Sequence, residues 1–166
     1  MTSDAPIEIR EIAADEFELL WPTFREVVAA GDTYSYAPDT TLEGARHLWT
    51  AGGTRCFIAM SSGVCVGGYM LRANQPGLGN HVANAGYMVS PQARSRGIAG
   101  RLCEHSLEQA RRAGFRAMQF NYVVSTNEVA VKLWQKHGFA IVGRVPKAFR
   151  HARLGPVDGF VMFREL

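Results

Sequence analysis

The sequence has few of the features that mark disulfide-linked, metal-binding or membrane-spanning proteins. Its three cysteines, Cys56, Cys65 and Cys103, lie far apart, and none belongs to a Cys-x-x-Cys pair. An odd number at this spacing argues against a disulfide framework and against a metal site, so we expect buried, reduced thiols. No stretch approaches the roughly eighteen apolar residues of a membrane helix, and no basic-then-apolar signal segment opens the chain. We therefore expect a cytoplasmic protein with no membrane partner.

Charge of one sign is not concentrated anywhere in the chain. The 18 Lys and Arg residues nearly balance the 15 Asp and Glu residues, and no block of five or more like charges occurs. We therefore expect no nucleic-acid partner. The full Gly-x-Gly-x-x-Gly pattern and the Lys-Ser/Thr pair of a P-loop are also missing, which argues against both nucleotide-binding classes. With 47% apolar and 20% charged residues, the chain fits one globular domain over residues 1–166.

The spacing of apolar residues predicts an α+β domain around a mixed sheet. Strands are expected at 7–12, 55–61, 64–71, 81–89, 117–124, 139–145 and 159–163. Helices are expected at 15–30, with Pro22 marking either a kink or a later start, and at 42–49, 96–113 and 128–137. A polar, basic stretch around Lys147 to Arg153 is expected to separate the last two strands. The helix at 96–113 implies a parallel crossover between the strands before and after it.

The turn after the strand at 81–89 carries the clearest sign of a ligand. Tyr87, Met88 and Val89 end that strand, and residues 94–100 form a turn rich in Arg, Ser and Gly that leads into a helix. The first amides of a helix have no partner inside it and carry its positive dipole end, so the turn predicts a site for phosphate or pyrophosphate. Its arginines suit bidentate contact with phosphate, or are solvated surface residues.

A second pattern follows at Asn127, Ala130, Leu133, Trp134 and Gly138-Phe139. Together with the earlier Val-x-Pro and Arg-x-x-Gly-x-Ala patterns, in this order, the chain resembles the GCN5-related N-acetyltransferase (GNAT) superfamily over about residues 6–166. The resemblance implies a mostly antiparallel sheet of about seven strands, a V-shaped splay between strands four and five, and about four helices. It also implies acetyl-CoA as cofactor and a homodimer.

The resemblance assigns cofactor roles to both patterns. The strand end at Tyr87, Met88 and Val89 would pair with the pantetheine arm, and the Val89 amide would polarise the thioester carbonyl. A fixed N–H at that point stabilises the transition state more than the ground state. Asn127 would touch the cofactor arm near its thiol end. The backbone amides of the turn would bind the pyrophosphate, at Arg94, Ser95, Arg96, Gly97, Ile98, Ala99 and Gly100.

The proton-transfer groups depart from the family pattern. Many members have a Tyr general acid where this chain has Trp134, and a Glu base on the fourth strand, which here contains no carboxylate. His81 and Tyr122 could relay a proton through water, or they are a surface histidine and a packed sheet residue. An acceptor amine with a pKa near about 8 would need no base, whereas one near about 10 would have to be bound in its neutral form.

Two asparagines, Asn84 and Asn121, lie on the strands that are expected to splay apart. They are either satisfied or solvated polar groups, or they bind a substrate carboxylate and position its nitrogen. The second interpretation fits a narrower resemblance to the L-azetidine-2-carboxylate acetyltransferases, carried by Gly31-Asp-Thr-Tyr34, Asn84-Ala-Gly, Asn121 and Ser125-Thr-Asn127. That resemblance implies that Asn84 holds the carboxylate and that Asn121 and Asn127 bracket the reacting nitrogen and the thioester. Tyr34 and Tyr36 would wall the pocket or, alternatively, cover the core edge.

We therefore predict an acetyl-CoA-dependent N-acetyltransferase that moves the acetyl group directly to the nitrogen of a small amino acid, imino acid or related amine. Val89, Asn121 and Asn127 are the predicted catalytic residues. The phosphinothricin-type acetyltransferases are a close alternative for the acceptor. Acetylation of a protein N-terminus or lysine, and a catalytically silent acetyl-CoA sensor, are the alternatives for the function.

Overall fold

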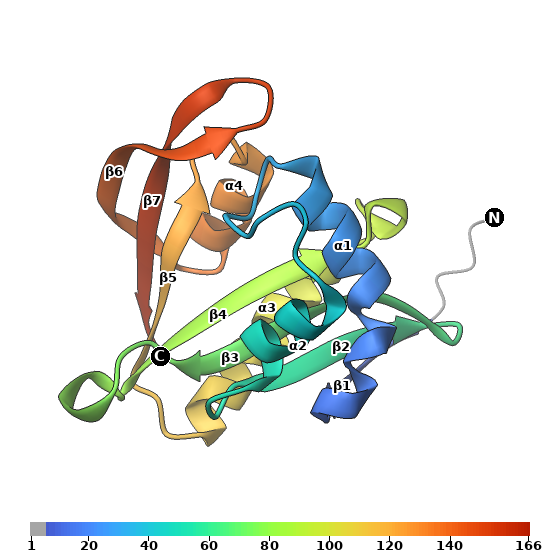
Figure 1. Ribbon diagram of the computed structural model, residues 1–166. Helices are drawn as coiled ribbons and strands as arrows, with labels where there is room; N and C mark the ends of the chain where they lie inside the picture. The colour runs from blue at the N-terminus through green and yellow to red at the C-terminus, as the bar shows by residue number, and fades with distance from the viewer. Residues whose placement is uncertain (1–5) are drawn as a thin grey trace.

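The fold comes from a computed structural model, which describes residues 6–166. Within these residues the chain forms seven strands, four α-helices and three short 3-10 helices (Figure 1). The strands are β1 (Ile7–Ile12), β2 (Arg55–Ser61), β3 (Val64–Ala73), β4 (Val82–Val89), β5 (Ala117–Val124), β6 (Ala140–His151) and β7 (Gly155–Glu165). The helices are η1 (Ala14–Leu19), α1 (Trp21–Ala30), α2 (Leu42–Thr50), η2 (Gly77–Gly79), η3 (Pro91–Ala93), α3 (Ile98–Arg112) and α4 (Glu128–Lys136). The α+β class and the expected numbers of strands and α-helices are confirmed.

The strands form one mixed sheet in the order β1-β2-β3-β4-β5-β7-β6. Only β4 and β5 are parallel neighbours, and they pair at just two positions, Val82 with Ala117 and Ala83 with Met118. Beyond these pairs β4 continues to Val89 while β5 turns away with β6 and β7, so the sheet divides into two arms (Figure 1). The predicted V-shaped splay is confirmed. We call the unpaired part of the sheet between β4 and β5 the β4–β5 opening.

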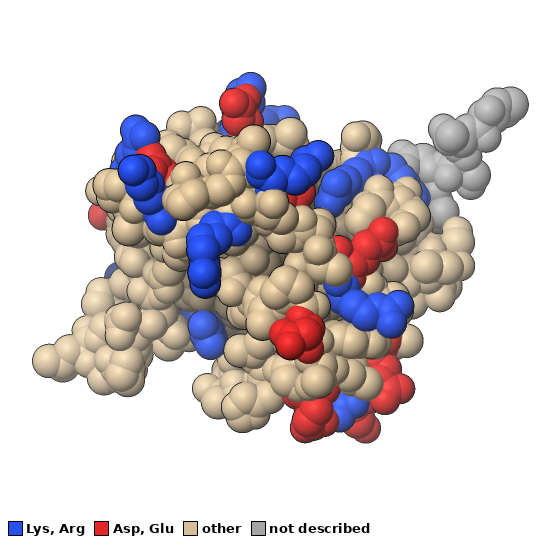
Figure 2. All heavy atoms as spheres, turned by 45° about the horizontal axis from the view of Figure 1, so that its top comes forward, with Lys and Arg blue, Asp and Glu red and all other residues tan. Residues whose placement is uncertain are grey.

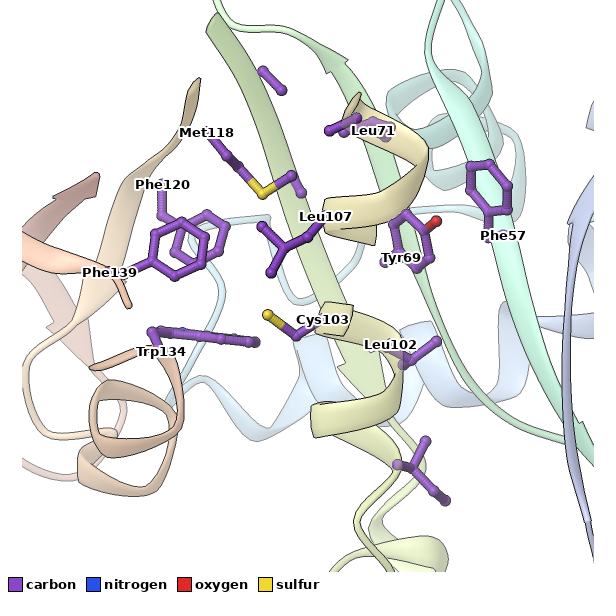
Figure 3. Close-up of a cluster of buried hydrophobic side chains, with 14 of the residues drawn as sticks. Phe57, Tyr69, Leu71, Leu102, Cys103, Leu107, Met118, Phe120, Trp134 and Phe139 are labelled. Carbon is purple, nitrogen blue, oxygen red and sulfur yellow. The ribbon is translucent and has the colours of Figure 1, made fainter. Parts of the chain in front are cut away.

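Two cores flank the first arm because its strands alternate apolar side chains between the two faces. On β3, Tyr69 and Leu71 join the core beneath α3 and α4, whereas Met70 joins the core beneath α1 and α2. Figure 3 shows the first of these cores, with Phe57, Tyr69 and Leu71 on one side of α3 and Met118 on the other. The α1 and α2 face of β4 is therefore the face that also carries the even-numbered residues Asn84, Gly86 and Met88.

The largest differences from the expected boundaries lie in two regions, and several other ends shift by one or two residues. The segment 15–30 is divided into η1 and α1, and α1 begins at Trp21 with Pro22 in its first turn, where a missing N–H is harmless. The basic stretch predicted to separate the last strands instead lies mostly in β6, which reaches His151 and is irregular between Val145 and Phe149. The last strand, β7, accordingly begins at Gly155 rather than at residue 159. An edge strand with one partner tolerates such polar residues and bulges, and apolar periodicity does not detect it.

Within residues 6–166 no helix is long and apolar enough to span a bilayer. In the same part of the chain, no three His, Cys, Asp or Glu side chains gather as a metal site would require.

Candidate active site

The hydrogen-bond pattern between β3 and β4 determines which backbone groups of β4 face the opening. The amide of Ser90 donates to the Val66 carbonyl at 2.9 Å, and the amide of Asn74 donates to the Val82 carbonyl at 2.8 Å. In an antiparallel ladder every second residue is bonded to its neighbour, so the even-numbered residues of β4 face β3. The N–H and C=O groups of Tyr87 and Val89 therefore point away from β3, into the β4–β5 opening.

This edge can bind an extended chain. A hydroxyl group confirms its direction, because Tyr34 donates to the Tyr87 carbonyl at 2.8 Å from outside the sheet. Among residues 6–166 no group accepts a hydrogen bond from the amides of Tyr87 and Val89. Met88, by contrast, pairs with Gly68 within the β3–β4 ladder, so its amide is not available to a ligand. Its side chain is buried and helps to hold this part of β4 in position.

The turn at 94–100 has the conformation of an anion site. Ser95 and Gly97 adopt left-handed backbone angles, with φ of 63° and 72°, and Gly97 caps α3 without any side-chain hydrogen bond. None of the described residues 6–166 accepts a hydrogen bond from the amides of Ser95 to Gly100. A Cβ on Gly97 would meet nothing within 4 Å, so the space above these amides is open. The residues therefore fit a pyrophosphate.

The arginines of the turn have different surroundings. Arg96 donates to the Ser61 hydroxyl at 3.2 Å and so ties the turn to the end of β2. Arg94 is exposed and has no ion pair within the described part of the chain. Figure 2 shows Lys and Arg side chains around the hollowed middle of one face, with most of the visible Asp and Glu side chains toward one edge. Such a face favours an anionic ligand.

The second pattern lies on α4, which covers the opening on the α3 side. Asn127 caps this helix, since its Oδ1 accepts from the Ala130 amide at 3.3 Å. Trp134 is 8% exposed, and its ring lies 4.7 Å from the Tyr87 ring and 5.1 Å from the Phe120 ring. Figure 3 shows it grouped with Phe120 and Phe139, facing Cys103 of α3. Trp134 therefore links β4 to β5 from behind the opening.

The two predicted asparagines lie on the opposite face of the opening. Met118 and Phe120 of β5 belong to the core under α3 and α4, so Gln119 and Asn121 point to the other face, as Asn84 does. Asn84 is 6% exposed, and its Nδ2 donates to the Gln119 carbonyl at 3.0 Å. This bond continues the connection between the arms just past the last paired residues.

Asn121 takes part in a second connection between the arms. Its Oδ1 accepts from the Gln119 Nε2 at 3.0 Å, and its Nδ2 donates to the Asn74 Oδ1 at 2.7 Å. Asn74 follows β3, so this chain of amides crosses from one arm to the other. Sequence reasoning missed Gln119 and Asn74. The position of Gln119 two residues before Asn121, on the same face of a strand, was the one available signal.

The tyrosines of the loop between α1 and α2 cover this face of β4. The Tyr34 and Tyr36 rings stack at 5.3 Å, and the Tyr36 hydroxyl accepts from the Trp49 indole at 3.3 Å. Burial raises the pKa of both hydroxyls, so they stay protonated. A Cβ on Gly86 would come within 3.0 Å of the Tyr34 hydroxyl oxygen, so a glycine on β4 makes room for that ring.

The two candidate proton relays are placed away from the Val89 amide or are engaged elsewhere. His81 precedes β4 at its closed end, about 26 Å from Val89 at the usual rise of a strand. It borders a cavity of about 430 Å³ that it shares with Arg116, Phe163 and Glu165 and that includes none of the predicted site residues. Tyr122 donates its hydroxyl hydrogen bond to the Ala148 carbonyl of β6.

Comparisons with known proteins agree with this geometry. The sequence model of the acetyltransferase (GNAT) family matches residues 9–139. The structure of a GCN5-related N-acetyltransferase from Kribbella flavida is similar with a TM-score of 0.90 and 44% identity, covering 96% of this chain and 98% of that one. A phosphinothricin acetyltransferase from Sinorhizobium meliloti in complex with AcCoA shares the fold, with a TM-score of 0.82 and 21% identity over 96% of this chain and 88% of that one.

Among curated proteins, N-acetyltransferase aca1 of Schizosaccharomyces pombe is 35% identical over 97 residues. The match covers 58% of this chain and 46% of that protein, so the chain spans about half the length of this curated relative. The family match covers well over half of the chain and includes the strand end, the turn and the α4 pattern. The chain therefore belongs to the acetyltransferase (GNAT) family.

Proposed function

We propose that the protein transfers an acetyl group from acetyl-CoA to the nitrogen of a small amino acid, imino acid or related amine, directly and within a ternary complex. The observation that carries this proposal is the unpaired edge of β4, which leads from the turn at 94–100 into the β4–β5 opening. Donor and acceptor can then enter this opening from its two faces, so no covalent enzyme intermediate is needed.

The backbone supplies the cofactor contacts in this proposal. Arg94, Ser95, Arg96, Gly97, Ile98, Ala99 and Gly100 hold the pyrophosphate, chiefly through the free amides of the turn. The open edge at Tyr87 and Val89 pairs with the pantetheine arm, and Met88 maintains the ladder behind it. When bound, acetyl-CoA supplies an activated acetyl group. The Val89 amide donates to the acetyl carbonyl oxygen as negative charge develops on it.

The acceptor is placed by the amides and tyrosines on the other face. Asn84 has one Nδ2 hydrogen and its Oδ1 left over after bonding to Gln119, and these are available to the substrate carboxylate and amine. Asn121 and Asn127 bracket the reacting nitrogen and the thioester, and Tyr34 and Tyr36 form the wall. The residues Asn84, Asn121 and Ser125-Thr-Asn127 that resemble the L-azetidine-2-carboxylate acetyltransferases favour an imino acid acceptor. A phosphinothricin-type acceptor remains the alternative, since a phosphinothricin acetyltransferase shares the fold.

The proposed reaction uses no carboxylate on β4 as a general base and no tyrosine on α4 as a general acid. Residues 82–89 contain no carboxylate, and Trp134 is part of the core. An amine with a pKa near about 8 is already partly neutral at pH 7 and attacks without a base. For a more basic amine, the apolar tyrosine wall favours binding of the neutral form.

Thiol release from acetyl-CoA, measured with a panel of amino acids, imino acids, amines and peptides, tests the proposal. We expect turnover with small amino or imino acids. Turnover with peptides alone would instead support a protein N-acetyltransferase. Tight cofactor binding without any turnover would support a silent sensor, the alternative that Trp134 and the missing carboxylate favour. A homodimer and a cytoplasmic location remain predictions, and light scattering at known concentration tests the first.

A further inference from the structure

We call the face of the opening that carries Asn84 and Asn121 and is covered by Tyr34 and Tyr36 the acceptor face. Arg72 is a cation on this face that the proposed function has not used. It is the next-to-last residue of β3 and lies directly opposite Asn84 in the β3–β4 register. Residues that face each other across two strands project their side chains to the same face, with Cβ atoms about 5 Å apart. Met70, two residues earlier on β3, lies in the core under α1 and α2, so Arg72 continues that face past the end of the core.

The charge of Arg72 has no partner within the described residues. It is exposed, and none of the eight ion pairs between residues 6 and 166 includes it. An unpaired guanidinium beside a buried amide is suited to a planar anion, because its parallel N–H groups match the two oxygens of a carboxylate.

A second donor lies near this guanidinium. The Tyr36 ring stacks on Tyr34, whose hydroxyl lies against Gly86, two residues along β4 from Asn84 and on the face that Arg72 shares. Burial raises the pKa of the Tyr36 hydroxyl, and the positive charge of Arg72 opposes this effect. The Tyr36 oxygen already accepts from the Trp49 indole at 3.3 Å, and no described residue accepts its hydrogen. Its ring is held by stacking on Tyr34 and, at 5.5 Å, on Phe24. The hydroxyl is thus a fixed donor with a free hydrogen.

We propose that Arg72 and Tyr36 form the carboxylate-binding site for the acceptor, next to Asn84, and so determine that the substrate is a free amino or imino acid. This inference rests on the proposed function and adds residues to it. Asn84 alone leaves a carboxylate unneutralised, because the amide is uncharged and one of its N–H groups is bound to Gln119. Arg72 supplies the charge, Tyr36 supplies a directed hydrogen bond, and Asn84 can then present its Oδ1 to the amine.

The test compares acceptors that differ only in the carboxylate. The probes are L-azetidine-2-carboxylate with its carboxamide, and L-alanine with alaninamide as an open-chain pair. Arg72→Gln should raise KM at least tenfold for the acids and leave KM for the amides and for acetyl-CoA within about twofold. Arg72→Lys should have an intermediate effect, since it keeps the charge without the planar fork. Tyr36→Phe keeps the stacked ring and should raise KM for the acids alone, by a smaller factor.

Arg111→Gln is the matched control, because Arg111 is an exposed arginine on α3, away from the acceptor face. It should change none of these constants. Equal effects of Arg72→Gln on acids and amides, or no effect on either, would overturn the inference while leaving the proposed function in place. If the unaltered protein acetylates none of the four probes and no other amino acid, imino acid or amine of the panel, both fail. If it acetylates only the amides, the inference fails and an amine acetyltransferase remains.

Discussion

Replacing Val89 by proline would remove one N–H group from the proposed site without breaking a hydrogen bond of the sheet. Val89 occupies a position in the β3–β4 ladder where the amide faces away from β3, as the Ser90 to Val66 bond next to it requires. Proline lacks this hydrogen and is tolerated on a strand edge whose N–H side is unpaired. The variant should therefore fold, and circular dichroism should show a cooperative melt close to that of the unaltered protein.

The expected effect is on the rate of chemistry. Loss of one preorganised donor to a developing oxyanion lowers kcat by about 10²- to 10³-fold, or about 3–4 kcal/mol of transition-state stabilisation. The Tyr87 amide and the free amides of the turn at 94–100 remain, so the affinity for acetyl-CoA in calorimetry should change by only a few-fold. Stopped or continuous thiol-release assays with the best acceptor of the panel give kcat directly.

Met88→Pro is the matched control, one residue away in the same strand. The Met88 amide faces Gly68 in the ladder and its side chain is buried, so this variant loses a sheet hydrogen bond and core packing and should melt far lower or fail to fold. If Val89→Pro keeps the original kcat, the Val89 amide is not the oxyanion donor. If both variants are equally stable, or equally unfolded, the assignment of odd-numbered residues to the opening is wrong.

Three further outcomes test the cofactor turn, the acceptor face and the core. Gly97→Glu should abolish acetyl-CoA binding in calorimetry, because a side chain is strained at φ 72° and a carboxylate there would cover the free amides. Gly114→Glu is the control: it has similar strain, at φ 86° beyond the other end of α3, and should retain acetyl-CoA binding. Unchanged affinity in the first variant would refute the pyrophosphate site. Asn84→Ala should raise KM for a carboxylate-bearing acceptor and leave KM for acetyl-CoA nearly unchanged, and equal changes in the two KM values would remove Asn84 from the acceptor site. Because the variant leaves the Gln119 carbonyl without its donor, it should also lower the free energy of unfolding by about 1–3 kcal/mol in denaturant titration. Burial raises the pKa of Cys56 and Cys103 from 9.0 to about 12, so at pH 8 the thiolate fraction of each is about a thousandfold smaller in the folded protein. A disulfide reagent should therefore modify both thiols at least that much more slowly than in the denatured chain. Rapid labelling of either thiol in the folded protein would contradict this.

The cofactor edge was predictable because its residues are contiguous in the chain. Tyr87 to Gly100 passes from strand to turn to helix, and local order alone indicates free amides at the helix start. The same stretch could not show which of Tyr87, Met88 and Val89 offers its amide. That choice depends on the phase of the ladder with β3, which the distant Val66 fixes through Ser90.

The acceptor face was predictable only in part. The pattern of apolar residues placed Asn84 and Asn121 on neighbouring strands, and the structure confirms that both lie on one face at the opening. Their partners Gln119 and Asn74 were missed because the hydrogen bonds join segments far apart in the chain, 35 residues for Asn84 to Gln119 and 47 residues for Asn121 to Asn74. The exposed Arg72 was invisible for the same reason, since an arginine near a strand end is ordinary until its register is known.

The β4–β5 opening is braced on both of its faces, and this bears on how the acetyl group is transferred. On the acceptor face, hydrogen bonds join Asn84 to Gln119 and Asn121 to Asn74. On the other face Trp134 packs against both arms, so bringing the strands together would compress a buried indole. Separating the arms would break the amide bonds, and closing them would overpack the core. These contacts oppose a change in the width of the opening, which suits the proposed direct transfer, in which an amine is placed beside a thioester without strong acid or base groups.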